Sequence, residues 1–524
     1  MNLDVFLDFR WKGGVLIYSE GFYNSIIYLE DLIRKGTGKD ANINVYILSI
    51  EDGGYKYYKL YHNKLKAEHN KDIINFVRIL HSGEYRKYGR EISLDEIIEN
   101  SKYNIKLFSN YSIGVFNRPL IDNIENLIDD RTIGTFHGDP IRAIIVNLYK
   151  FTLEGKLSLA PEEFSELEKL YKEVLKHNYT SVELVKRTLR FIDKLYNSNK
   201  EFMEKFSWII DEIDHYKKII ETIEKNKSKI LFPTLSLYHA YNSMSEAMLG
   251  KNIAHISFIT MEPHHFISIL KKNNREIEEI SNEYMKIYGE NSEYNLNGKI
   301  KYWIIFNGRT GPDKGMDSLL NIVDRLLSEG KEVGLIIISP DIKEESKEYK
   351  KLEEIVKKHK GKTVVHIYGD SIGNSLHENP IFYISLLKAL GKLKRTIFVN
   401  PANIESFGLA TIEAISIGEL PVVYRDIEGL SNLKEEGYLK RELGGKTDEE
   451  LYTIIKNLLE GIENGRYDEL VDKEVVEKLR KEMDPEDFAR RLYRLIEMII
   501  KEKEKEDNEE KLEKSEVQTQ VIAG

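Results

Sequence analysis

The stretch from Thr396 to Tyr424 constrains the fold most strongly, because it predicts a strand, a tight loop, a helix and a second strand in close succession. A β-branched, apolar run opens the stretch and ends at an Asn-Pro pair. Gly418 stands where a helix over about residues 407–417 would end, and Leu420 begins the next strand. A strand–helix–strand unit of this kind requires a parallel sheet.

The same alternation occurs on both sides of a polar, Gly- and Asn-rich segment at residues 289–298, which we predict to be a domain linker. The predicted class is therefore α/β, with two doubly wound, Rossmann-like domains. We expect an N-terminal domain over 1–295, a C-terminal domain over 296–480, and a C-terminal helix with a charged tail over 481–524. The tail beyond Glu502 is expected to be disordered or a frayed extension of that helix. The expected strands are 2–9, 42–50, 229–237, 252–260, 301–307, 334–339, 363–368, 396–399 and 420–424.

The pattern changes between Pro161 and Lys227, where apolar residues recur at alternating spacings of three and four. The phase slips at Asn197–Asn199. We predict a long helical hairpin with its turn there, inserted into the N-terminal domain. Its expected role is packing or contact with a partner.

Composition excludes several classes of function. With 41% hydrophobic and 31% charged residues, the chain has the composition of a soluble globular protein. It contains no cysteine, so no disulfide and no thiolate site is expected. The formal net charge of −10 argues against nucleic acid as a partner. No secretory signal or membrane span is recognisable, so a cytoplasmic location is expected. The richness in Ile, Lys, Glu and Tyr suggests a thermophile.

Two glutamates stand out in the Thr396–Tyr424 stretch. Glu405 lies in the loop, and Glu413 is the only charged residue in the helix that follows. A lone carboxylate in an apolar row is costly to bury unless a donor satisfies it. Glu413 is thus either a structural carboxylate with a neighbouring partner or a group that binds ligand hydroxyls. The free N–H groups at the helix start would face anionic oxygens beside it.

A basic pair follows the first strand of the C-terminal domain. Arg309 and Lys314 flank the Gly-rich turn between Gly308 and Gly315, which leads into a helix. Arginine offers a two-pronged fork and lysine a compact charge, and both suit a phosphate at a helix start. A pair of surface cations with no ligand is the alternative.

Candidate residues in the N-terminal domain lie on loops that follow predicted strands. A Gly pair after the first strand would let backbone approach a ligand closely, although a plain turn explains it as well. Histidines follow three further predicted strands, and the loop within residues 131–140 is expected to expose an Asp beside its His. A metal site is not expected, since the histidines are scattered without a carboxylate pair. The residues concerned are Gly13, Gly14, His137, Asp139, His239 and His264.

The string from Gly308 to Gly315 resembles the first strand–helix loop of the C-terminal domain in retaining glycosyltransferases of family 4, which have the GT-B fold. Glu405-Ser406-Phe407-Gly408-Leu409, with Glu413 eight positions after Glu405, is similar to that family's Glu-x7-Glu signature. The strong resemblance covers about residues 300–430. It implies two domains that face each other across a cleft.

The resemblance also implies roles. Arg309 and Lys314 would hold the diphosphate of the donor, Glu413 the ribose hydroxyls and Glu405 the hydroxyls of the donor sugar. Backbone at Gly13, Gly14, Gly308, Phe407, Gly408 and Leu409 would approach the donor. The family carries a histidine near the donor sugar, for which His239 fits best and His137 second, while the choice among these and His264 stays open.

The implied activity is transfer of a hexose, with retention, from a nucleotide-diphosphate sugar such as UDP- or GDP-hexose, without a cofactor or metal. The acceptor would be a sugar, a lipid or a protein glycan. Peripheral membrane association and self-association through the helical insertion are further options. The loop from Asp426 to Leu430 departs from the family, because it keeps one glycine where a pair is common.

Two other classes remain as alternatives. The first is a glycogen-synthase-like transferase or a sugar-nucleotide epimerase on the same fold. The second is a non-catalytic scaffold that binds a partner through the helical insertion.

Overall fold

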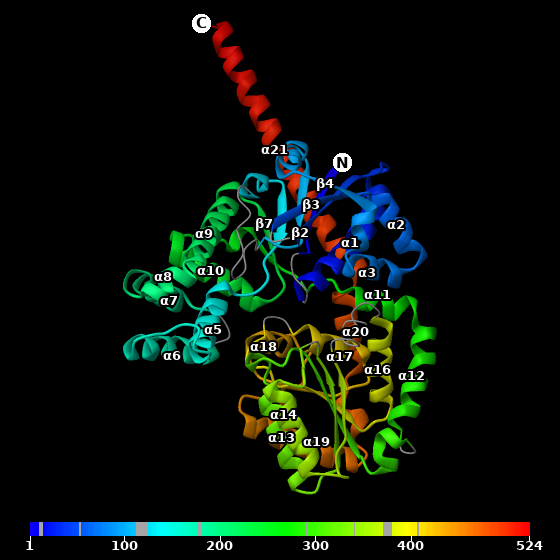
Figure 1. Ribbon diagram of the computed structural model, residues 1–524. Coiled ribbons are helices and arrows are strands. Elements are labelled where there is room, and N and C mark those ends of the chain that lie inside the picture. The colour runs from blue at the N-terminus through cyan, green and yellow to red at the C-terminus, as the bar shows by residue number, and fades with distance from the viewer. Residues whose placement is uncertain are drawn as a thin grey trace.

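The computed structural model describes residues 1–9, 14–51, 54–111, 124–176, 180–289, 292–339, 341–369, 380–405 and 408–523. Two α/β bodies lie one above the other, and the C-terminal helix α21 runs up along the N-terminal body and beyond it (Figure 1). Each body is built on one sheet. The predicted α/β class with two doubly wound domains is confirmed, and the chain has the GT-B arrangement.

The C-terminal sheet is entirely parallel, with strand order β11-β10-β9-β12-β13-β14. Its central strands are continuous apolar runs because helices cover both faces. The strands are β9 (Tyr302–Asn307), β10 (Val333–Ile338), β11 (Val365–Tyr368), β12 (Thr396–Asn400), β13 (Val422–Arg425) and β14 (Gly444–Gly445). The helices between and after them are α13 (Met316–Ser328), α14 (Lys347–Lys358), α16 (Pro380–Lys392), α17 (Leu409–Ile417), α18 (Glu428–Glu435) and α19 (Asp448–Glu463).

The N-terminal sheet has the order β4-β3-β2-β1-β5-β6-β7-β8, in which β3 is antiparallel to both β2 and β4 and the other pairs are parallel. Its strands are β1 (Asn2–Asp8), β2 (Asn42–Glu51), β3 (Gly54–Leu60), β4 (Gly89–Ile92), β5 (Ile105–Phe108), β6 (Thr132–Thr135), β7 (Lys229–Phe232) and β8 (Ser257–Ile259). The helices that accompany it include α1 (Gly14–Thr37), α3 (Ile73–His81), α4 (Leu94–Ser101), α5 (Pro140–Leu153), α10 (Leu235–Leu249) and α11 (His265–Lys272).

The segment over 161–227 is helical, but it is not a hairpin of two long helices. It forms α6 (Pro161–Lys176), α7 (Val182–Ser198), α8 (Lys200–Phe206) and α9 (Trp208–Asn226). The break at residue 199 has a local cause, because the Asn199 side chain accepts a hydrogen bond from the Phe202 N–H and caps α8. The apolar sides of these helices join a core that includes residues of β5 and β7, so the segment thickens the N-terminal body.

The chain crosses between the bodies twice. Helix α12 (Asn274–Tyr288) packs along α16 and so already belongs to the C-terminal body, before the linker expected at residues 289–298. After α20 (Lys473–Glu482), helix α21 (Pro485–Ala523) returns and packs against α1. The stretch expected to be a disordered or frayed tail is helical to Ala523.

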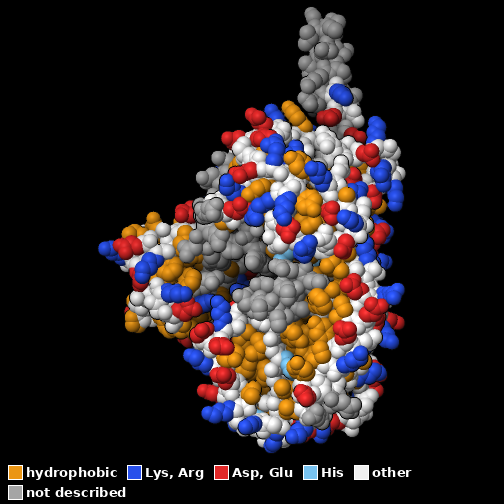
Figure 2. All heavy atoms as spheres, turned by 45° about the vertical axis from the view of Figure 1, so that its right-hand side comes forward, with side chains coloured by type: hydrophobic (Ala, Val, Ile, Leu, Met, Phe, Trp, Pro, Cys, Tyr) orange, Lys and Arg blue, Asp and Glu red, His pale blue; other side chains and the backbone are white. Residues whose placement is uncertain are grey.

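Charged side chains are spread over both bodies on the face shown in Figure 2, while hydrophobic side chains gather on the C-terminal body. Within the ranges given above, no helix combines the length and the apolar character that a membrane crossing requires.

Candidate functional site

The site lies where the C-terminal sheet changes direction. From β9 the chain moves outward through β10 and β11, and it then returns to β12 on the other side of β9. The loops after β9 and β12 therefore diverge from neighbouring strands, and such a switch point is where open parallel sheets bind ligands. The two loops are the ones that carry the basic pair and the Glu-x7-Glu stretch.

Backbone contacts join these two loops. The Asp313 carbonyl accepts hydrogen bonds from the N–H groups of Asn403 (2.8 Å) and Ile404 (3.1 Å). Gly315 has φ +69°, and a Cβ there would lie 2.0 Å from the Pro401 carbonyl oxygen. Only glycine fits, since it tolerates this conformation and leaves room for the second loop. These main-chain contacts thus fix the distance in space between the two loops.

One ion pair between side chains joins the two loops, and a second lies within the loop after β9. Lys314 Nζ lies 2.8 Å from Glu405 Oε2, and both side chains are about four-fifths buried, with 20% and 18% exposed. Arg309 pairs with Asp313 at 3.0 Å but is 63% exposed. The loops therefore offer one sheltered cation beside a carboxylate and one cation that is free to reorient in solvent.

Helix α17 begins at this point. Gly408 adopts φ +76° at its N-cap, and a Cβ there would meet Leu430 of α18 at 2.5 Å. Leu409 is the first helical residue, so the free N–H groups of the first turn open beside Glu405. The Gly429 N–H donates to the Glu405 carbonyl, which ties the first turn of α18 to the same loop.

Glu413 is buried inside α17 and has partners from two directions. His264 Nε2 lies 3.1 Å from Glu413 Oε1, and only 3% and 8% of the two side chains are exposed. Burial raises the pKa of the Tyr383 hydroxyl well above its usual value, and Glu413, which accepts a hydrogen bond from it, adds to the rise. Asn307 Nδ2 donates to that hydroxyl at 2.6 Å. The end of β9, α16 and α17 thus share one polar network.

The facing loops of the N-terminal body hold His137, which follows β6. Its Nδ1 lies 2.9 Å from Glu262 Oε1, and its Nε2 lies 2.9 Å from the Ser109 carbonyl oxygen. Burial alone would lower the pKa of His137, but the Glu262 carboxylate and the Ser109 carbonyl raise it above its usual value. Because both nitrogens face acceptors, the doubly protonated ring suits this place. The Tyr18 ring of α1 packs on the imidazole at 4.4 Å.

Two other predicted candidates have different surroundings. Asp139 was expected on an exposed loop, but it is buried and caps α5 by accepting from the Arg142 N–H at 3.1 Å, and it also accepts from the Thr180 hydroxyl. His239 was expected in a loop after a long strand. The strand ends at Phe232, Thr234 caps α10, and His239 therefore lies on a helix. Gly14 begins α1, while Gly13 and Phe407 lie outside the described residues.

Sequence reasoning missed Glu262, Asn307 and Tyr383 as members of these networks. Asn307 immediately precedes the Gly308–Gly315 turn, and Glu262 lies two positions before His264. Their places at strand ends were a usable signal. Tyr383 gave no such signal, because it lies 76 residues after Asn307 on a helix whose pattern is simply apolar.

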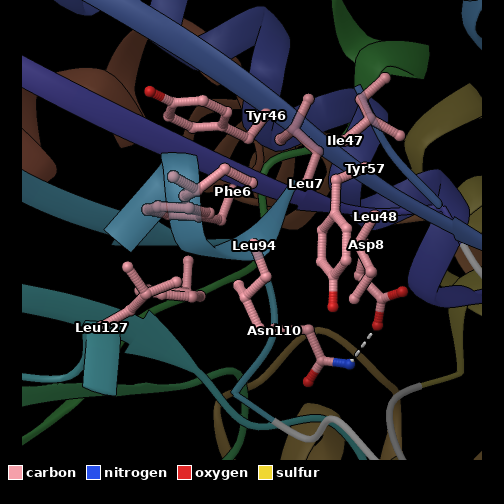
Figure 3. Close-up of a pocket in the computed structure, with 12 residues that line it drawn as sticks. Phe6, Leu7, Asp8, Tyr46, Ile47, Leu48, Tyr57, Leu94, Asn110 and Leu127 are labelled. Carbon is pink, nitrogen blue, oxygen red and sulfur yellow. Dashed lines mark hydrogen bonds between the residues drawn. The ribbon is translucent and has the colours of Figure 1, made fainter. Parts of the chain in front are cut away.

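A further cavity lies on the N-terminal sheet (Figure 3). Phe6, Tyr46, Tyr57 and Leu94 line it with other apolar side chains, and the hydrogen bond from Asn110 Nδ2 to Asp8 Oδ2 (2.8 Å) closes one end. Its lining is that of a gap between the sheet and α4. In the described part of the chain, no group of three or more His, Asp or Glu could hold a metal ion.

Comparison with solved structures finds distant likenesses over almost the whole chain. A glycosyltransferase from Rickettsia africae is 11% identical, with 95% of this chain and 98% of the other covered and a TM-score of 0.48. Trehalose 6-phosphate synthase from Burkholderia multivorans is 9% identical, with 97% and 98% covered and a TM-score of 0.47. Sucrose-phosphate synthase from Thermosynechococcus elongatus is 13% identical, with 95% and 99% covered and a TM-score of 0.46.

Among curated proteins the search finds no match. The family comparison does find one, and it falls on the body that carries the joined loops, Lys314, Glu405 and Glu413. Residues 290–473 match the family model of glycosyl transferases group 1.

Proposed function

We propose that this protein is a retaining glycosyltransferase of family 4 that moves a hexose from a nucleotide-diphosphate sugar to a sugar, lipid or protein-glycan acceptor. The observation that carries the proposal is the pairing of Lys314 with Glu405 at 2.8 Å across the two loops of the switch point. A cation and a carboxylate held side by side there suit the two chemical parts of such a donor, its phosphates and its sugar hydroxyls.

In this proposal, each residue binds a different part of the donor. Lys314 and Arg309 neutralise the diphosphate, and the charge that grows on it as it leaves is where such cations accelerate the reaction. The N–H groups at the start of α17 face the same oxygens. Glu405 accepts from the sugar hydroxyls and Glu413 from the ribose hydroxyls. In the N-terminal body, the pair of His137 and Glu262 is a buried charged group behind the loop after β6, and both ring nitrogens are already hydrogen-bonded within the protein.

In the proposed reaction the bond between the anomeric carbon and the diphosphate oxygen breaks. The acceptor hydroxyl forms the new bond on the same face of the sugar, and its proton passes to the departing diphosphate. The products are the glycosylated acceptor and a nucleoside diphosphate. No cofactor takes part in this sequence.

A thermal-shift screen with UDP, GDP and ADP tests donor binding. One of them should stabilise the wild type by about 2.7 kcal/mol at roughly a hundredfold excess over its Kd. Lys314→Ala should abolish most of this stabilisation and the transfer activity. Lys456→Ala is the matched control, because this lysine forms an ion pair with Glu329 on the surface, away from both loops. Equal stabilisation of wild type and Lys314→Ala would contradict the assignment.

Retention needs a separate measurement. Nuclear magnetic resonance of the product made from an α-linked donor should show an α-linked glycoside. A β-linked product would exclude the retaining class while leaving donor binding intact. Net epimerisation of the nucleotide sugar without an acceptor would instead favour the epimerase alternative.

A further inference from the structure

His264 lies at the place where the chain crosses between the two bodies. It follows β8 and caps α11, which Figure 1 places at the boundary above α16 and α17. Its backbone N–H donates to the Met483 carbonyl at 2.9 Å, in the segment where the chain returns from α20 to α21. The crossing from α11 to α12 and the return to α21 are therefore joined at this residue, and the ion pair between Lys271 and Asp484 reinforces the junction.

The hydrogen bonds of His264 fix its tautomer. Its Nδ1 accepts from the Phe266 N–H at 3.1 Å and so carries no proton. The proton of the neutral ring is then on Nε2, which points to Glu413 Oε1 at 3.1 Å. The imidazole is thus a donor to Glu413, held in one orientation by the backbone of its own helix. Neither side chain can shift without breaking a buried hydrogen bond.

This contact leaves Glu413 able to bind a ligand. A carboxylate has about four acceptor positions, and the bonds from His264 and Tyr383 use two of them. The remaining lone pairs on both oxygens can accept from two neighbouring hydroxyls. The hydrogen bond from His264 therefore orients the carboxylate and leaves acceptor positions for a ligand.

We propose that His264 is a positioning residue that aims Glu413 at the ribose diol of the donor and so links ribose recognition to the junction between the two bodies. This inference rests on the proposed function, since it takes Glu413 to be the ribose-binding group. It adds that the N-terminal body takes part in nucleotide recognition through a side chain that does not itself touch the nucleotide. The preference for ribose over deoxyribose should then depend on His264.

Two substitutions separate this role from a purely structural one. His264→Asn keeps the cap, because Asn is a good N-cap and can accept from the Phe266 N–H, but it is too short to reach Glu413. His264→Gln places an amide N–H near the position of Nε2 and weakens the cap. Asp72→Ala removes the cap of α3, where Asp72 accepts from the Ile74 N–H, and serves as a control for loss of stability alone.

The measurement is the Kd for whichever of UDP, GDP and ADP the wild type binds, and for its 2′-deoxy counterpart. In His264→Asn the ribonucleotide should bind about tenfold more weakly while the deoxynucleotide changes little, since a hydrogen bond to a charged group is worth about this factor. His264→Gln should keep the wild-type preference and melt at a lower temperature. Asp72→Ala should melt lower with the preference unchanged.

The outcomes discriminate between the two claims. If the wild type prefers ribose and His264→Asn keeps that preference, His264 does not position Glu413, while the proposed function stands. If the preference follows the melting temperature across all variants, the role of His264 is structural only. If the wild type binds none of the three nucleotides, the proposed function fails and this inference fails with it.

Discussion

At the residue scale, two glycines with similar backbone angles make very different contacts. Gly315 (φ +69°) lies against the Pro401 carbonyl, whereas Gly330 (φ +88°) has no atom within 4 Å of the place where a Cβ would lie. The left-handed conformation is costly for any other residue at both positions. Only at Gly315 does it also set the distance between the two loops of the site.

Replacing each glycine by alanine should separate the free-energy cost of the left-handed backbone from the cost of the steric contact with the second loop. Gly330→Ala should lose about 1–2 kcal/mol of unfolding free energy from backbone conformation alone. Gly315→Ala should lose about 1–3 kcal/mol more, because its Cβ forces the loops apart. It should also lose nucleotide binding. Urea denaturation and nucleotide titration of both variants measure these effects, and equal losses would show that the contact with Pro401 is not restrictive.

The buried pair of His137 and Glu262 predicts a dependence of stability on pH. The pKa of His137 is raised in the folded protein, so the protonated ring stabilises the fold. This contribution is complete below the unfolded value of 6.5 and is lost as the pH rises through the folded pKa. The difference in unfolding free energy between wild type and His137→Gln should therefore shrink as the pH rises above 6.5. Urea denaturation at several pH values measures it, and a difference that grows with pH would contradict the assigned charge.

At the element scale, α21 supplies part of the N-terminal core. Phe488, Leu492, Ile496 and Ile499 recur at helical spacing and are at most 1% exposed, in one cluster with residues of β1 and α1. The helix thus belongs structurally to the N-terminal body, although it is the last helix in the sequence. Its outer side is charged and lies in solvent.

Substitutions on the two sides of α21 should differ sharply. Leu492→Ala should lower the unfolding free energy by about 2–5 kcal/mol, through lost burial and the cavity left behind. Met498→Ala, at a position that is 41% exposed, should change it by less than about 0.5 kcal/mol. Denaturant unfolding of both variants provides the comparison, and similar losses would mean that α21 does not dock on α1 in solution.

The sequence was most informative where one local pattern determined the structure. Strands β9, β10 and β12 were predictable because they are buried on both faces and are followed by Gly, Ser-Pro or Asn-Pro signals. The break expected at Asn197–Asn199 is present, but the prediction of two long helices was wrong because apolar spacing did not show that new helices also begin at Val182 and at Trp208. The exposed position expected for Asp139 was wrong for a related reason, since a carboxylate just before a helix can bind a ligand or can cap that helix.

The candidate site could be predicted only in part, because its partners are distant in sequence. Lys314 and Glu405 were identified from their motifs, but their pairing depends on strand order, which places β12 beside β9. The contact of His264 with Glu413 depends on how two bodies meet. No local pattern encodes that arrangement.

At the scale of the whole molecule, the two bodies depend differently on the C-terminal helix. The core of the C-terminal body is made of residues up to Met483, with Ile73 as the one buried contribution from before residue 261 among the described residues. The N-terminal core contains five buried residues from α21. Removing the helix should therefore affect one body far more than the other.

Two truncations test this dependence. Ending the chain after Glu506 removes only the projecting part of α21 and keeps the residues that pack on α1, so the calorimetric unfolding temperature should not change. Ending it after Asp484 exposes the apolar face of α1, and each lost side chain withdraws about 1.5–3 kcal/mol of burial. The N-terminal body should then unfold at a clearly lower temperature, ahead of the C-terminal body. A single transition at the full-length temperature after the longer deletion would show that α1 and the sheet hold the N-terminal body together without α21.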